Sequence, residues 1–331
     1  MSEEKPAKAE AQAETEAYVT SKDVKRVWEE IYSELEKVII GNVDILEDLF
    51  ISLLGGGHCL LEGVPGIAKT VMAKYFAGTL GCEFKRIQFT PDLLPSDVVG
   101  TTIYDPKAGT FKMRKGPIFC NIVLSDEINR SPPKTQAALL EAMAEKQVTV
   151  EGTTFELESP FLVIATQNPI EQEGTYPLPE AQVDRFMFKL LVDLPSPDEE
   201  KEIIELIHKG IRKTVRRVTT PMTITKMIET VARRVYVHED IINYIRELVV
   251  STRTDPRLIL GGSPRCSIAL LNAGKAVAAM RGRDYVIPDD IKRVSRIATA
   301  HRLQMKPEAE LEGTTGTMVV DEILRNLVVP V

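Results

Sequence analysis

One short segment, residues 63–70 with the sequence Gly-Val-Pro-Gly-Ile-Ala-Lys-Thr, constrains the fold more than any other part of the chain. The apolar run 58–61 before it predicts a buried strand, and the pattern after it predicts a helix over 70–78. Glycines let the backbone N–H groups of such a loop wrap a phosphate, and the N-terminus of the following helix adds a favourable dipole. The segment therefore predicts a phosphate-binding loop within an α/β sheet.

Two side chains at the end of this loop predict contacts with a nucleotide. We expect Lys69 to reach the β- and γ-phosphates and the Thr70 hydroxyl to bind Mg²⁺. Ala68 stands where the usual pattern has glycine, and its small side chain fits if its φ is negative. The residues predicted to bind the nucleotide here are Gly63, Val64, Pro65, Gly66, Ile67, Ala68, Lys69, Thr70 and Val71.

An acidic pair follows a second apolar run, about 55 residues after the loop. Residues 122–124 predict a buried strand, and the chain then continues through Ser125 to Asp126 and Glu127. In P-loop nucleotide hydrolases, a carboxylate at this place holds the Mg²⁺. The sequence therefore predicts Asp126 as a metal-binding residue, together with Thr70. It predicts Glu127 as the residue that polarises the attacking water.

A third apolar run leads to another polar residue. Residues 161–165 predict a strand that is followed by Asn168, and a helix is predicted over 133–145. Asn168 is a candidate to orient the water or the γ-phosphate, although an asparagine before a proline is also typical of a turn. With a further strand over 84–89, short apolar runs alternate with helices, which predicts a parallel α/β sheet.

Two arginines complete the candidate catalytic set of Lys69, Glu127, Asn168, Arg185 and Arg265. Arg185 could act as a finger supplied by a neighbouring subunit, or be an ordinary surface ion-pair residue. Arg265 follows a serine suited to the N-cap and a proline suited to the first helical position. A helix dipole disfavours a cation in the first turn, so the position makes more sense if Arg265 faces a phosphate.

The chain divides at the Leu-Pro-Ser-Pro segment 194–197. Residues 1–17 hold mainly Ala, Glu and Lys and predict a disordered tail. Residues 18–195 predict an α/β nucleotide-binding core, which begins with helices over 18–38 and 45–53. Residues 196–331 predict a helical domain. Its expected helices are 198–213, 224–235, 239–252, 264–282 and 288–302.

Two segments inside the core predict β-hairpins. One covers 104–113 and turns at 106–109, and the other covers 148–157 and turns at 151–152. Surface decoration is one interpretation of such hairpins. Because both hairpins lie within a predicted nucleotide-binding core, a functional role is as well supported as surface decoration.

Composition excludes several other classes. The net charge of −7 argues against a protein that coats nucleic acid through bulk charge. The four cysteines are widely spaced, which fits buried thiols in a reducing compartment better than a disulfide framework or a zinc site. No apolar run approaches the length of a membrane span, and no apolar signal core is seen. We expect a cytoplasmic protein.

Taken in order, these motifs resemble those of AAA+ ATPases, and the match narrows to the MoxR family. By that resemblance Asn168 corresponds to sensor 1, Arg185 to the arginine finger and Arg265 to sensor 2. Gly41 corresponds to the segment near the adenine, although Asn42 stands where the family usually has glutamine. The segments that carry the resemblance are 63–70, 89–97, 126–136, 165–169, 173–186 and 262–265.

The resemblance implies a fold and a mode of action. The fold is a five-stranded parallel sheet flanked by helices, with the hairpins 104–113 and 148–157 as the helix-2 and pre-sensor-1 inserts, followed by a smaller all-helical lid domain. The active form is a ring, commonly a hexamer, with Mg²⁺ and ATP at each subunit boundary. The work is chaperone-like remodelling, often with a partner that carries a von Willebrand factor A domain. Such partners take part in the assembly or activation of enzymes, which includes the insertion of metals or cofactors.

Two alternatives share most of these residues. The ATPase subunit of a metal chelatase would differ only in its partner. A ring that remodels nucleic acid would need basic residues at a hairpin tip to meet phosphates. The tip at 151–154 has none, whereas the other hairpin carries Lys112, Arg114 and Lys115. Nucleic acid is therefore the less favoured partner.

Overall fold

The computed structural model describes residues 19–64, 66, 69–107, 109–168, 175–210 and 213–330. The predicted tail 1–17 lies outside the described residues, as do Pro65, Ile67 and Ala68 of the phosphate-binding loop.

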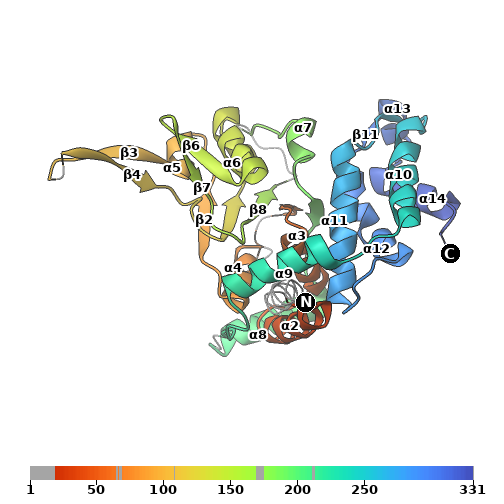
Figure 1. Ribbon diagram of the computed structural model, residues 1–331, viewed down its shortest axis with the longest axis horizontal. Coiled ribbons are helices and arrows are strands. Elements are labelled where there is room, and N and C mark those ends of the chain that lie inside the picture. The colour runs from red at the N-terminus through yellow and green to blue at the C-terminus, as the bar shows by residue number, and fades with distance from the viewer. Residues whose placement is uncertain are drawn as a thin grey trace, which may run out of the picture.

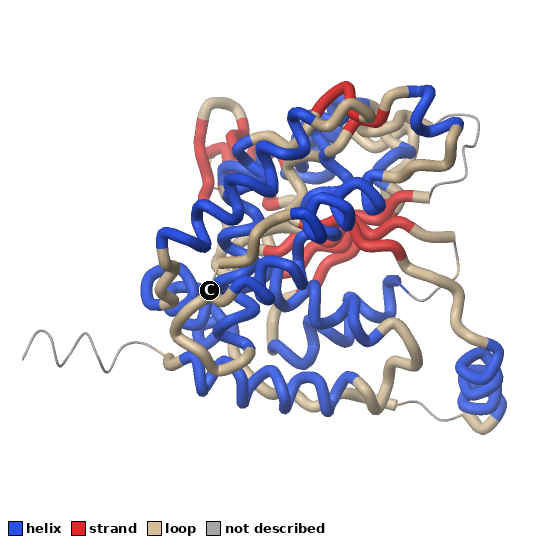
Figure 2. The backbone as a smooth tube through the Cα atoms, turned by 90° about the vertical axis from the view of Figure 1, so that its right-hand side faces the viewer, coloured by secondary structure: helices blue, strands red, loops and turns tan. Residues whose placement is uncertain are grey.

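One parallel sheet forms the centre of the molecule, with helices on both of its faces (Figures 1 and 2). Its strand order is β2-β5-β8-β1-β9, which confirms the predicted five-stranded parallel sheet. The predicted bounds of β1, β2, β5 and β8 agree with the structure within a few residues. Strand β9 was not predicted. The strands are β1 (Cys59–Glu62), β2 (Phe84–Gln88), β5 (Ile122–Asp126), β8 (Leu162–Gln167) and β9 (Phe188–Leu191).

Successive residues of a strand face opposite sides of this sheet and enter different hydrophobic clusters. Ile122 and Leu124 of β5 pack on the side that holds the two N-terminal helices, whereas Val123 packs on the other side. Burial on both faces explains why the central strands β1, β5 and β8 are mostly apolar. The helices of this part are α2 (Ser21–Leu35), α3 (Val43–Leu54), α4 (Lys69–Leu80), α5 (Pro95–Val99), α6 (Pro133–Glu145) and α7 (Glu180–Val183), with a short 3₁₀ turn, η1 (Ile128–Arg130).

Both predicted hairpins are present. Strands β3 (Gly100–Asp105) and β4 (Thr110–Lys115) pair antiparallel and project away from the sheet (Figure 1). Strands β6 (Gln147–Val150) and β7 (Thr153–Glu156) form the second hairpin, beside α6.

The C-terminal part is mainly helical, as predicted. The predicted helix 198–213 is too long, because the chain turns after His208 and Gly210 takes a left-handed φ of +63°. A short antiparallel sheet of β10 (Leu258–Leu260) and β11 (Gln304–Met305) joins the helices and was not foreseen. The helices are α8 (Pro197–His208), α9 (Pro221–Arg234), α10 (Glu239–Thr254), α11 (Pro264–Met280), α12 (Pro288–Thr299), η2 (Ala300–Arg302), α13 (Pro307–Leu311) and α14 (Gly316–Asn326).

The N-terminal helices link the two parts. Helices α2 and α3 both pack against α11, and α2 also packs against α4 beside the sheet. One continuous hydrophobic cluster therefore runs from the sheet into the C-terminal helices. None of the described helices is long and apolar enough to cross a membrane.

Candidate active site

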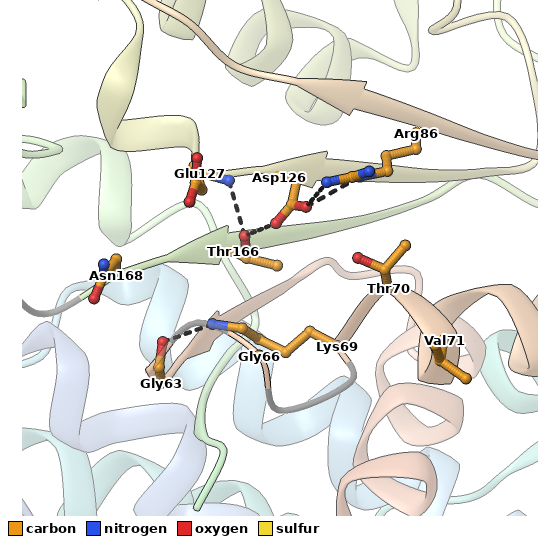
Figure 3. A pocket seen from close by; sticks show the side chains of 10 residues that line it. All are labelled: Gly63, Gly66, Lys69, Thr70, Val71, Arg86, Asp126, Glu127, Thr166 and Asn168. Carbon is orange, nitrogen blue, oxygen red and sulfur yellow. Dashed lines mark hydrogen bonds and ion pairs between the residues drawn. The ribbon is translucent and has the colours of Figure 1, made fainter. Parts of the chain in front are cut away.

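A cleft of about 370 Å³ opens where the parallel strands end, beside the start of α4 (Figure 3). Open α/β sheets bind ligands at this edge. Residues predicted from three separate segments meet here. The described residues that line the cleft are Gly63, Gly66, Lys69, Thr70, Val71, Arg86, Asp126, Glu127, Thr166 and Asn168.

The phosphate-binding loop leads into α4 at Lys69. Gly66 takes a φ of +90° with open space where a Cβ would lie, so the backbone conformation and not crowding requires glycine. The Lys69 ammonium donates to the Gly63 carbonyl at 2.7 Å. Partial burial lowers the pKa of Lys69, and the carboxylates of Asp126 and Glu127 oppose that shift. The ammonium is therefore held in the cleft by a weak neutral partner that an anion can replace.

Asp126 ends strand β5, and its two carboxylate oxygens have different partners. Oδ1 accepts from the Thr166 hydroxyl at 2.5 Å. Oδ2 accepts from Nε of Arg86 at 3.0 Å and from Nη2 of the same guanidinium at 2.7 Å. The carboxylate is thus fixed in the cleft at both oxygens (Figure 3).

Glu127 follows in a left-handed conformation with φ +56° and ψ +51°. Such a backbone is rare for a residue with a side chain and persists only when its surroundings hold it. Here the Glu127 N–H donates to the Thr166 hydroxyl at 2.8 Å. The Glu127 carboxylate accepts from the Gln88 amide at 2.8 Å and from Arg130 at 2.9 Å.

Asn168 lies at the end of β8 and lines the same cleft, as the sequence predicted. Its backbone carbonyl accepts from the Asn129 amide at 3.5 Å. Sequence reasoning missed Arg86, Gln88 and Thr166. For Arg86 and Gln88 the sequence did offer a signal. They stand two residues apart in β2, so both side chains lie on the same face of the sheet.

Arg185 and Arg265 lie away from this cleft. Neither is among the described residues that line it. The Arg185 guanidinium donates to the Leu140 carbonyl at 3.0 Å, and the Arg265 guanidinium lies 3.6 Å from the Asp184 carboxylate. The structure therefore places both arginines around the segment 184–186 instead of beside Lys69.

Asp184 is the centre of that second cluster. The Ser263 hydroxyl lies 3.1 Å from both of its carboxylate oxygens, and Nε of Arg302 donates to it at 2.9 Å. The Arg302 side chain is only 3% exposed. It also donates to the backbone carbonyls of Asp184, Phe186, Met187 and Ala298. The turn that carries Arg185 is therefore fastened to the C-terminal helices.

A larger, mostly apolar cavity of about 670 Å³ lies behind the phosphate-binding loop and shares Val71 with the cleft. Gly41 lines it with a left-handed φ of +72°, and a Cβ there would lie 2.9 Å from a carboxylate oxygen of Glu199. Asn42 also lines the cavity, and its side-chain amide donates to the Asp193 carbonyl at 3.3 Å. An apolar cavity beside a predicted phosphate site suits a flat heterocycle. Its apolar walls include Ile39, Ile40, Met72, Tyr75, Ile203, Leu206 and Ile207.

The Asp184 cluster makes a prediction about stability. We expect Arg302→Met to lower the free energy of unfolding by about 3 kcal/mol or more, because it removes a buried cation and leaves carbonyls without donors. Urea unfolding followed by circular dichroism measures the loss. Arg296→Met is the matched control, because that side chain is 62% exposed and pairs with Asp321. We expect it to cost less than about 1 kcal/mol. Equal losses would contradict the role given to Arg302.

Two segments of the chain match known protein families. Residues 58–188 match the ATPase family associated with various cellular activities (AAA). Residues 250–323 match the AAA lid domain.

Individual relatives extend over nearly the whole chain. The uncharacterized protein YeaC of Bacillus subtilis is 48% identical over 90% of this chain and 93% of its own. Chaperone MoxR1 of Mycobacterium tuberculosis is 42% identical over 90% of this chain and 81% of its own. The crystal structure of a candidate ATPase from Cytophaga hutchinsonii superposes with a TM-score of 0.89 at 41% identity, covering 97% of this chain and 99% of that one.

Proposed function

Because the chain belongs to the MoxR family of AAA+ ATPases, we propose that it hydrolyses ATP in the cleft at Lys69 and uses the reaction to remodel other proteins. One observation carries the proposal. The cleft brings together a phosphate-binding lysine, an acidic pair and a polar residue from three different strands and loops, namely Lys69, Asp126, Glu127 and Asn168. This is the set that hydrolysis of a nucleoside triphosphate requires.

We assign Mg²⁺ to the Thr70 hydroxyl and the Asp126 carboxylate. Both are the hard oxygen donors that Mg²⁺ prefers, and both line the cleft. Within the described part of the chain, no group of three or more His, Cys, Asp or Glu side chains could hold a metal alone. That fits a cation held partly by nucleotide phosphates and water. When bound, Mg²⁺ would neutralise charge on the β- and γ-phosphates.

The protein side chains divide the remaining work. Lys69 would leave the Gly63 carbonyl for the phosphates and stabilise the charge that spreads over them in the transition state. Glu127 would orient and polarise the attacking water. Asn168 would hold the water or the γ-phosphate. The nucleotide base would lie in the apolar cavity lined by Gly41.

Arg185 and Arg265 would serve the cleft of a neighbouring subunit. Their distance from their own cleft supports this, since both gather around Asp184 instead. We propose a ring, most simply a hexamer, in which Arg185 is the finger and Arg265 the sensor for the adjacent nucleotide. Arginine fingers supplied in this way contribute roughly 10³–10⁵ in rate.

We divide the chain into a core, 18–195, and a lid, 196–331, as the moving parts. Arg302 and Ser263 of the lid hold Asp184 of the core, next to Arg185. A change at the nucleotide could thus be transmitted between the finger and the lid.

The cellular role we propose is chaperone-like assembly or activation of a client complex, with a von Willebrand factor A domain protein as partner. Insertion of a metal or cofactor into a client enzyme is one form of this work. The chaperone name of the mycobacterial relative supports the general role. The four cysteines are buried free thiols, which supports a reducing compartment such as the cytoplasm.

The role of Glu127 is tested by Glu127→Gln. We expect ATP binding to be kept and turnover to fall about 100-fold or more, because the amide cannot polarise water as a carboxylate does. Binding is measured with a fluorescent nucleotide and turnover by phosphate release. Lys69→Ala is the comparison and should lose binding as well. Unchanged turnover in Glu127→Gln would defeat the assignment.

The proposal that Arg185 acts in the cleft of a neighbouring subunit is tested by mixing two variants that should each be inactive, Arg185→Ala and Lys69→Ala. An equal random mixture should recover hydrolysis at about a quarter of the interfaces, where an intact cleft meets an intact finger. As control, a mixture of Lys69→Ala with Glu127→Gln should stay inactive, since both defects lie in the same cleft. No recovery in the first mixture, with rings still formed, would show that Arg185 does not act across the boundary.

The partner is sought by affinity capture from host extract. Glu127→Gln protein loaded with ATP should enrich a von Willebrand factor A domain protein, with or without its client, relative to Lys69→Ala. The extract is treated with nuclease, and an untreated sample is run beside it. Material that is lost on nuclease treatment, with nucleic acid bound in the untreated sample, would favour a nucleic-acid remodelling ring instead.

A further inference from the structure

Arg86 is the charged side chain, among the described residues that line the cleft, to which the proposed hydrolysis gives no role. It stands on β2, the edge strand of the sheet, and its guanidinium reaches across to Asp126 of β5. Two of its N–H groups, on Nε and Nη2, meet one oxygen, Oδ2, while a third contact joins Nη2 to the Gln88 amide oxygen at 2.5 Å. Arg86 and Lys69 are the two cationic side chains among the described residues that line the cleft.

This contact adds little that the fold needs. The Arg86 side chain is 47% exposed, and ion pairs of exposed side chains contribute little to stability. Asp126 by contrast is only 13% exposed, so few directions of approach to it remain. Thr166 already occupies Oδ1. The guanidinium lies at Oδ2, the carboxylate oxygen that Thr166 does not contact, so a cation that approaches Asp126 from this side meets Arg86.

We propose that Arg86 makes metal binding at this site depend on nucleotide, by competing with the divalent cation for Asp126. This inference rests on the proposed function, because it takes Asp126 as the metal-binding carboxylate. A free cation meets a carboxylate that is already neutralised, and it meets the positive charge of Arg86 as well. A nucleotide brings phosphate oxygens that can bind both the cation and the displaced guanidinium.

The competition has a thermodynamic consequence. If the nucleotide removes the obstacle that Arg86 presents, nucleotide and cation must strengthen each other's binding, and by the same factor. Without the positive charge at position 86, the cation should bind alone more tightly and gain less from the nucleotide. The charge of the side chain at position 86, and not its size, therefore controls how tightly the cation binds alone.

The test is binding of Mn²⁺ alone, followed by the electron paramagnetic resonance signal of the free ion. We expect Arg86→Gln to bind one Mn²⁺ about tenfold more tightly than the natural chain, since a charge-assisted pair no longer has to be broken. The charge-keeping variant Arg86→Lys should stay close to the natural affinity. The matched control is Arg246→Gln, because Arg246 is an exposed arginine of α10 that pairs with Glu247 far from the cleft residues in the sequence, and this variant should change nothing.

Two further measurements test whether the change in Mn²⁺ affinity arises at Asp126. In Arg86→Gln/Asp126→Asn the added Mn²⁺ affinity should disappear, because it depends on the Asp126 carboxylate. Adding ADP should raise the Mn²⁺ affinity of the natural chain by a factor about tenfold larger than that of Arg86→Gln.

Unchanged Mn²⁺ binding in Arg86→Gln would overturn the inference, and so would a gain that survives loss of the Asp126 carboxylate. Circular dichroism of each variant verifies that it is folded. Because the metal-alone titration needs no turnover, it decides the role of Arg86 even if the chain proves not to hydrolyse ATP. Failure of hydrolysis with intact competition at Asp126 would instead count against the proposed function.

Discussion

The hydroxyl of Thr166 is the contact on which the arrangement of the cleft depends. It donates to Asp126 and accepts from the backbone N–H of Glu127, so one atom of β8 fixes the last residue of β5 and the residue that follows it. The left-handed backbone of Glu127 needs such support, because an ordinary residue does not stay in that conformation without it. The two carboxylates therefore have different partners, as the roles proposed for Asp126 in binding Mg²⁺ and for Glu127 in polarising water require.

Much of this could be predicted because the motifs lie at the ends of strands. The helix expected over 133–145 has those bounds, and the residues of the phosphate-binding loop, Asp126 and Asn168 meet at one edge. Parallel strands bring their carboxyl ends together whatever their order, so no knowledge of the pairing was needed. Strand β9 escaped prediction because its four residues include a lysine and carry no period of their own.

The contacts between strands and between domains could not be predicted in the same way. Arg86 contacts Asp126 because β2 pairs with β5, and that pairing cannot be predicted from a single sequence. Arg302 was expected as the last residue of a helix, a place where arginines usually serve the helix dipole. In the structure it lies in a 3₁₀ turn and holds a carboxylate that is distant in the chain. Sequence spacing gives no signal for such a contact.

Two carboxylates, Asp126 and Asp184, each hold an arginine, Arg86 and Arg302, and they do so in opposite ways. The Arg302 partner of Asp184 is buried and also donates to four backbone carbonyls, so breaking that contact would leave several buried groups without partners. The Arg86 partner of Asp126 is half exposed and bound at one oxygen, so it can be exchanged. The proposed mechanism needs both kinds of contact, since the proposed finger Arg185 has to keep its place on its own subunit while the proposed metal site has to respond to the nucleotide. The difference in burial between Arg302 and Arg86 therefore separates the rigid part of the proposed mechanism from the part that changes with the nucleotide.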